Sequence, residues 1–185
     1  MTYRTHVALS LSLTLIPFST TILPVEDTLQ LALIIITTYI FSLSPDFDEP
    51  NSYLSKRFPW IIISSVISIF TTHRGVTHRF LAPFIVTIAT LPFFVYYPEY
   101  SFLIPVIFLA YLGHLIGDGF TIGGLRRFYY PFSKSTKWFL PKILRFKTGS
   151  ITENFYLFIF SILSIFQLYF VIINNSIAGI TQYFS

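Results

Sequence analysis

Over 185 residues, 54% of the side chains are hydrophobic and only 11% are charged, whereas soluble domains carry roughly a quarter of charged residues. Such a surface cannot face water on every side, which excludes an ordinary soluble domain. The absence of cysteine excludes disulfides, thiolate zinc sites and thiol nucleophiles, so imidazole and carboxylate groups must hold any metal. A net charge of +4 is too small to indicate nucleic acid, and no specific nucleic-acid partner is predicted.

Long uncharged segments predict membrane-spanning helices, because about 20 apolar residues cross the roughly 30 Å hydrocarbon core. Five segments have this character: residues 7–25, 28–45, 80–98, 100–117 and 155–173. The segment Trp60–Phe70 has only 11 residues and favours a short re-entrant or interfacial helix. The expected fold is an all-α integral membrane protein. It is a single domain, residues 1–185, with a bundle of about five transmembrane helices plus one short helix.

The charges predict which side of the membrane each loop occupies. If the five segments cross and the short one does not, all twelve Lys and Arg residues share one side. The opposite side then holds only Glu26, Asp27 and Glu99 as charged residues. The positive-inside rule makes the basic side cytoplasmic. If residues 60–72 crossed instead, the basic stretch 126–147 would lie outside. We expect a multi-pass protein of the cell membrane, with the lipid bilayer as its partner.

One pair of ionisable residues lies inside an apolar segment. His114 and Asp118 are four residues apart, so on a helix both side chains project from one face, one turn apart. Together they can bind one metal ion. The alternative is a helix-terminal aspartate beside a histidine that bonds a backbone carbonyl. Ionisable groups inside a membrane are costly and usually functional, which favours the metal-ligand interpretation.

Two further pairs lie at the ends of the predicted spans. Asp46 and Asp48 follow the second span and can converge in a turn, as metal ligands, a bridge between two metals or a general base. The alternative is an exposed acidic turn. His73 and His78 flank Gly75, which permits a tight bend, so both imidazoles can be delivered from one loop. Their alternative role is anchoring at the lipid headgroups.

Weaker candidates complete the set. His6 precedes the first span on the same side, and only the neighbouring candidates make it a ligand. Glu153 closes a capping box that begins at Ser150, a structural role compatible with support of a metal-bound histidine. Arg74 and Arg126 can grip a phosphate, whereas most basic residues of the aromatic-rich stretch that includes Arg126 suit headgroup anchoring.

In this order the residues resemble the YdjM-type family of inner-membrane-associated, metal-dependent hydrolases. The resemblance runs over about residues 4 to 155 and rests on His6, Pro45-Asp46-Phe47-Asp48, His73-Arg74-Gly75-Val76-Thr77-His78, His114-Leu115-Ile116-Gly117-Asp118, Thr121 with Gly123, Tyr130-Pro131-Phe132, and Thr148-Gly149-Ser150 with Glu153. It implies metal-dependent hydrolysis without fixing a substrate. A fainter similarity links the chain to the zinc-dependent phospholipase C and P1 nuclease group. The N-terminal Trp ligand and one further His of that group are missing here, which favours two metal ions over three.

The expected function is that of a membrane-bound, metal-dependent hydrolase. Its site holds two divalent ions, identified as zinc, on the cytoplasmic face, and acts on a phosphoester such as a phospholipid headgroup. The expected metal ligands are His6, Asp46, Asp48, His73, His78, His114, Asp118 and Glu153. The expected catalytic residues are Asp46, Asp48, Arg74 and Arg126. The alternative is a non-catalytic membrane anchor or regulator that binds a cytoplasmic partner and retains the metal as structure.

Overall fold

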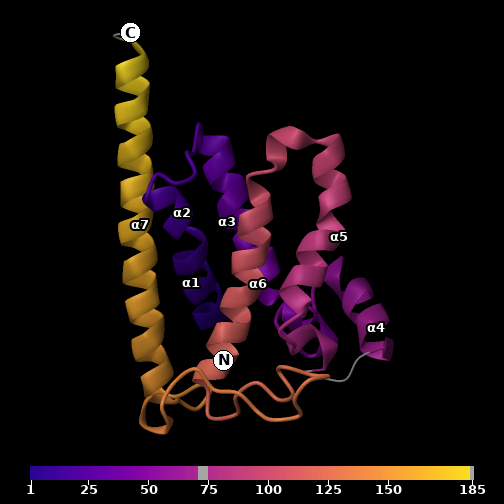
Figure 1. The fold of residues 1–185 in the computed structure, drawn as a ribbon. Coiled ribbons are helices and arrows are strands. Elements are labelled where there is room, and N and C mark those ends of the chain that lie inside the picture. Colours follow the sequence, from indigo (N-terminus) through magenta and orange to yellow (C-terminus); the bar gives the residue numbers. More distant parts are fainter. Residues whose placement is uncertain (71–74, 184–185) are drawn as a thin grey trace.

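A computed structural model describes residues 1–70 and 75–183 of the chain. Within these residues the fold is all-α, as expected, with turns and isolated β-bridges between the helices (Figure 1). The α-helices are α1 (Tyr3–Thr14), α2 (Ile16–Ser19), α3 (Thr28–Leu43), α4 (Trp60–Phe70), α5 (Ala82–Tyr96), α6 (Leu103–Phe120) and α7 (Ile151–Tyr183). Short 3₁₀ turns follow several of them: η1 (Ser44–Asp48), η2 (Val76–His78), η3 (Pro98–Tyr100) and η4 (Lys142–Leu144).

Three helical segments in the described residues are long and apolar enough to cross a membrane. They are Thr28–Asp48 with 21 residues, Leu103–Phe120 with 18, and Ile151–Asn175 with 25. The helix α5 is apolar but has 15 residues, which extend only about 22 Å. The apolar helix α4, with 11 residues, is shorter still, as its sequence predicts. The chain is therefore an all-α membrane protein in which the helices differ widely in length.

The first predicted span, residues 7–25, is wrong as a single helix. The helix α1 ends at Thr14, and a separate turn of helix, α2, carries Pro17 in its first turn. Proline lacks an amide hydrogen and its ring clashes with the carbonyl four residues earlier, so it begins a helix more readily than it continues one. Thr21 then adopts a positive φ of 60°, beyond the end of α2.

Two other predicted spans are displaced. The helix α6 begins three residues later than expected, because η3 occupies the turn before it. The helix α6 ends at Phe120, so Asp118 lies in its last turn and His114 one turn earlier. The helix α7 begins four residues earlier than expected, and the hydroxyl of Ser150 accepts a hydrogen bond from the backbone N–H of Glu153 at 3.3 Å. This is the predicted capping contact, and it starts the helix where the polar segment ends.

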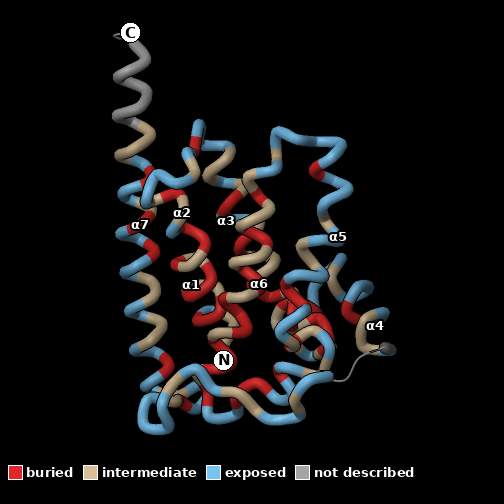
Figure 2. The backbone as a smooth tube through the Cα atoms, in the orientation of Figure 1, coloured by how far each residue is buried: buried red, intermediate tan, exposed pale blue. Residues whose placement is uncertain are grey.

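The helix α6 is the centre of the bundle. It packs against α1, α3 and α5, and 61% of its apolar span is buried, compared with 17% for α7. Figure 2 shows the same contrast, with buried backbone concentrated in α1 and α6. The contact between α1 and α6 is close because a side chain at Gly113 would collide with Ser10. The hydroxyl of Ser10 donates to the carbonyl of Ala110 at 2.9 Å, which fixes the two helices together.

The connections separate into two ends of the bundle (Figure 1). One end holds the N-terminus, η1 and the long segment 121–150. The other holds the turn after α2, the turn after α5 and the C-terminus. Helix α4 lies in the same half as the N-terminus. This arrangement places the described basic residues at one end, as the charge pattern predicts.

Candidate metal centre

Five of the predicted ligands lie together at the N-terminal end of the bundle. Their ligand atoms form two overlapping groups, in each of which the atoms are within 4.8 Å of one another. The groups are His6, His114 and Asp118, and Asp46, His78 and His114. Residues from α1, η1, η2 and α6 thus meet at one point, although 112 positions separate the first from the last in the sequence.

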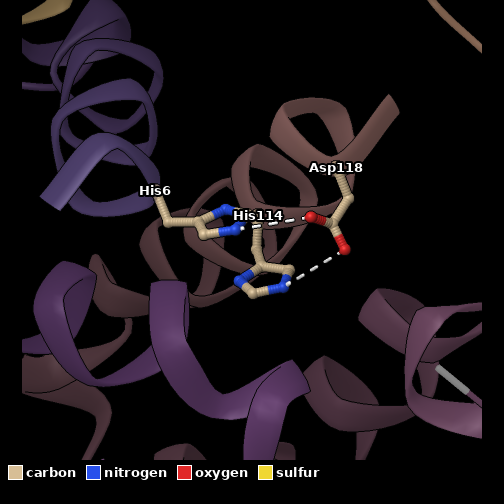
Figure 3. Close-up of side chains that lie close together, drawn as sticks. All are labelled: His6, His114 and Asp118. Atoms are coloured by element: carbon tan, nitrogen blue, oxygen red, sulfur yellow. Dashed lines mark ion pairs between the residues drawn. The ribbon is translucent and has the colours of Figure 1, made fainter. Parts of the chain in front are cut away.

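Helix α1 delivers His6 onto the face of α6. The rings of His6 and His114 stack with their centroids 3.8 Å apart and their planes 6° from parallel. Figure 3 shows His6 reaching from α1 toward His114 and Asp118 on α6. Gly117 makes this possible, since a Cβ atom there would lie 3.1 Å from Nδ1 of His6. The close packing of the two helices is therefore what assembles this half of the cluster.

The orientation of His114 is fixed by a backbone contact. Its Nδ1 lies 2.7 Å from the carbonyl oxygen of Ser42, so Nδ1 carries the hydrogen and donates it. Its Nε2 is then a lone-pair nitrogen, buried, and has no hydrogen-bond partner among the described residues. Nδ1 of His6 is also buried and has no hydrogen-bond partner among these residues. Buried polar atoms without a partner are costly in a folded protein, and a bound cation would satisfy a nitrogen of this kind.

Asp118 lies between the two groups. Its Oδ1 is 3.5 Å from Nε2 of His6, whereas its Oδ2 is 3.5 Å from Nε2 of His78 and 4.0 Å from Nε2 of His114. The amino group of Met1 also lies 3.2 Å from Oδ1, so a positive charge already faces this carboxylate. Asp118 could therefore contribute a carboxylate oxygen to a metal ion held by either group.

Asp46 and Asp48 have different environments in spite of their spacing. Oδ1 of Asp46 is 3.6 Å from Nε2 of His78 and 3.5 Å from Nε2 of His114, and its side chain is 28% exposed. Asp48 is buried, and its Oδ2 accepts a hydrogen bond from the Thr77 hydroxyl at 2.6 Å. The same oxygen lies 3.4 Å from Nδ1 of His78. Asp48 therefore orients His78 so that Nε2 faces the cluster, an arrangement common behind metal-bound histidines.

The carboxylates create a strongly negative environment at His78. Burial alone lowers the pKa of this imidazole, but the nearby carboxylates of Asp46, Asp48 and Asp118 raise that pKa to about 9. The same negative potential would attract any cation that entered the cluster. The donor set, imidazole nitrogen with carboxylate oxygen and no sulfur, is one that Zn²⁺ and other divalent transition metals accept.

The comparison with known families agrees with the resemblance that the order of the motifs indicates. The model of the YdjM inner membrane protein family matches residues 1–183. The chain belongs to this family. Its relatives include the inner membrane protein YdjM of Escherichia coli (strain K12) and that of Shigella flexneri, each 39% identical over 88 residues. The match covers 45% of this chain and 42% of each relative, so the matched part spans less than half of either protein. No solved structure matches the chain.

Membership of the YdjM family and the long apolar helices together support a location in the membrane. The family name describes a place and gives no activity. The buried histidines and aspartates of this YdjM-family chain could hold a metal ion.

The other predicted site residues lie elsewhere. Glu153 belongs to neither ligand group, and its carboxylate accepts the backbone N–H groups of Thr2 at 2.5 Å and Gly149 at 2.6 Å. It ties the start of α1 to the start of α7. Arg126 is exposed in the segment 121–150. The remaining two candidates, His73 and Arg74, lie outside the described residues.

A cavity of about 410 Å³ leads from the surface to the cluster. Its inner end is lined by His6, Asp46 and Asp118, and Tyr3 and Tyr53 contribute to its wall. Arg126 does not line it. Sequence reasoning missed the two tyrosines, because nothing in their spacing connects α1 with the segment after η1. It also missed Thr77, which the histidine motif already contained between its two imidazoles.

Proposed function

We propose that this chain is a membrane-bound, metal-dependent hydrolase with two divalent ions, zinc being the proposed metal, and a phosphoester substrate such as a phospholipid headgroup. The observation that carries the proposal is the buried group of three imidazoles and two carboxylates at the base of a surface cavity. Ionisable groups in the interior of a membrane protein cost free energy, and those that are present usually serve a function.

The ligands divide naturally between two ions. His6 and one oxygen of Asp118 would hold the first ion, whereas His78, Asp46 and the other oxygen of Asp118 would hold the second. His114 can join only one of them, because its Nδ1 hydrogen is donated to Ser42 and Nε2 alone remains for coordination. Two ions are therefore sufficient to use every ligand in the described cluster.

Bound divalent ions supply a Lewis acid for a phosphoryl oxygen and lower the pKa of water toward about 7. The chain's own residues do the rest. Asp46 is the partly exposed carboxylate on the cavity wall, so we assign it the acceptance of a proton from water. Asp48 keeps His78 in orientation through Nδ1. Arg74 remains a proposed phosphate contact, whereas the exposed position of Arg126 favours headgroup anchoring.

The site is proposed to face the cytoplasm. The described basic residues gather at the end of the bundle that holds the site (Figure 1). The positive-inside rule assigns that end to the cytoplasm. The chain has no cysteine, so single-cysteine labelling is direct. Lys56→Cys should be protected from a membrane-impermeant maleimide in intact spheroplasts, whereas Glu99→Cys should react. Labelling of Lys56→Cys from outside would reverse the orientation.

A second candidate is a non-catalytic membrane protein with a structural metal site. The observation that favours it is the origin of the ligands in four separate elements, because an ion there would cross-link α1, η1, η2 and α6. Metal analysis of the detergent-purified chain, followed by assays on phospholipids and generic phosphodiesters, separates the two. Turnover that chelation abolishes supports the hydrolase. A full metal load without turnover on a broad panel supports the structural role.

A further inference from the structure

Four side chains, here called the stack, contact one another in a row beside the cavity. The guanidinium carbon of Arg57 lies 3.9 Å from the ring centroid of Tyr53. The rings of Tyr53 and Tyr3 are 3.7 Å apart and 7° from parallel. On the far side of the stack, Nε of Arg4 donates to the hydroxyl of Tyr3 at 3.2 Å. Because both tyrosines line the cavity, the stack holds two cations beside its opening.

The two guanidinium groups are available to a ligand. A guanidinium that lies against an aromatic ring keeps its N–H donors free in the plane, where they can grip phosphate oxygens in pairs. Both arginines are exposed, and among the described residues neither Arg4 nor Arg57 forms an ion pair with a carboxylate. Tyr53 restricts the motion of Arg57 through the ring contact and a side-chain hydrogen bond. A guanidinium has five N–H donors, so others remain for a ligand. The restricted motion of Arg57 lowers the entropy cost of binding an anion.

The charge of the cavity depends on its metal. Three carboxylates line it, those of Asp46, Glu49 and Asp118. These carboxylates outnumber the one amino group that also lines the cavity, that of Met1, so without a metal ion the cavity repels an anion, although the two arginines attract one. Two divalent ions would outweigh the three carboxylates, so the loaded cavity would be positive from its base to its mouth. An anionic ligand that spans this distance is favoured only in the loaded state.

We propose that Arg57 and Arg4, braced by Tyr53 and Tyr3, bind a second anionic group of a phosphate ester whose first phosphoryl group faces the metal ligands. This inference rests on the proposed function and narrows its substrate class to esters that carry two anionic groups. The cavity volume of about 410 Å³ is in the range of sites for small molecules and headgroups. The ester is either the headgroup of a lipid or a water-soluble compound, since both present the same chemistry to the stack.

The test compares two non-hydrolysable probes that differ only in the second anion. Propane-1,3-diphosphonate and propylphosphonate are titrated calorimetrically into the zinc-loaded, detergent-purified full chain. We expect the diphosphonate to bind more tightly. Arg57→Gln and Arg4→Gln should each weaken diphosphonate binding about tenfold, the effect of one lost charge-assisted contact, and leave propylphosphonate binding within about twofold. The zinc-to-protein ratio, measured after each titration, should be unchanged.

Lys56→Gln is the matched control, because it removes the same charge from the residue next to Arg57 and Lys56 is exposed. Its diphosphonate affinity should stay within about twofold of the unmodified chain. If Lys56→Gln and Arg57→Gln lost the same diphosphonate affinity, the proposal would be overturned, because net charge alone would then explain the attraction. Unchanged affinity in Arg57→Gln would overturn it as well.

The same measurements separate this proposal from the hydrolase assignment. Diphosphonate binding that depends on Arg57, in a chain that hydrolyses no phosphoester, would keep the subsite and reject the hydrolase. Turnover with wild-type diphosphonate affinity in Arg57→Gln would keep the hydrolase and reject the subsite. Repeating the titration in phosphatidylcholine nanodiscs with and without cardiolipin identifies the source: competition by cardiolipin indicates a lipid substrate, and its absence indicates a soluble ester.

Discussion

The two ends of the bundle differ in what fills their interior. At the end away from the cavity, the core is apolar and nearly complete, with Leu15, Ile34 and Val106 fully buried. At the cavity end, the largest fully buried side chains include His6, His78 and His114. The apolar end depends mainly on packing, with a few buried hydroxyl contacts such as Thr38 to Thr14, whereas the polar end depends on partners for its ionisable groups. The comparison indicates that one end stabilises the fold and the other is positioned by it.

The largest expected effect is loss of the metal without loss of the fold. His114 belongs to both ligand groups, and Asp118 belongs to one and lies 3.5 Å from His78 of the other, so in His114→Ala and in Asp118→Ala the metal-to-protein ratio should fall close to zero. Helix content by circular dichroism should be retained, because the apolar end is untouched. Elemental analysis of detergent-purified protein measures the ratio.

The matched control is Gln167→Leu, a buried polar residue of α7 that belongs to neither ligand group. Its metal content should equal that of the unmodified chain. Full metal stoichiometry in both ligand variants would show that the cluster is not a metal centre. Loss of metal in Gln167→Leu would show that the ratio reports folding and not ligation.

A cavity in the apolar end should have the opposite consequences. Ile34 is fully buried, and Ile34→Ala leaves unfilled space in a packed core, which in soluble proteins costs about 2–5 kcal/mol of unfolding free energy. The thermal midpoint in detergent should fall, whereas the metal-to-protein ratio below the transition should be unchanged. If Ile34→Ala lost its metal while still folded, the two ends would be coupled more tightly than their separate cores suggest.

A residue that supports the cluster from behind should have an intermediate effect. Asp48→Asn keeps the shape of the side chain but removes the charge that orients His78 through Nδ1. Loss of such support typically weakens metal affinity by 10- to 100-fold. Full stoichiometry should return at high metal concentration, in contrast to His114→Ala. Competition with a chelating dye measures the affinity. An affinity equal to that of the unmodified chain would remove Asp48 from the site.

Sequence patterns were sufficient where the deciding interactions are local. The bounds of α3 follow from uncharged residues between two polar turns, and the spacing of His114 and Asp118 fixes their common helix face. The short helix α4 follows from its 11 apolar residues. Each of these features depends on neighbours along the chain, whose effect can be read from periodicity and composition.

One local feature was outweighed by composition: residues 7–25 are apolar throughout, but Pro17 begins a new helix and does not continue the first. Tertiary contacts decided the rest. The role of Thr77 depends on Asp48, 29 positions earlier, and the stack of Tyr3 on Tyr53 joins residues 50 positions apart. No periodicity connects such partners. The sequence therefore indicated the histidines and aspartates that cluster better than it indicated the residues that hold them in place.

The smallest expected effect concerns Glu153, for which sequence reasoning allowed two roles. Its carboxylate accepts backbone N–H groups from Thr2 and Gly149, so it joins α1, which carries His6, to the start of α7. Glu153→Gln preserves the shape of the side chain and weakens two charge-assisted hydrogen bonds. We expect a loss of about 1–2 kcal/mol of unfolding free energy, with an unchanged metal-to-protein ratio. If the metal-to-protein ratio of Glu153→Gln were instead lower by one ion per chain, Glu153 would be a ligand, and the metal centre would extend to the first turn of α7.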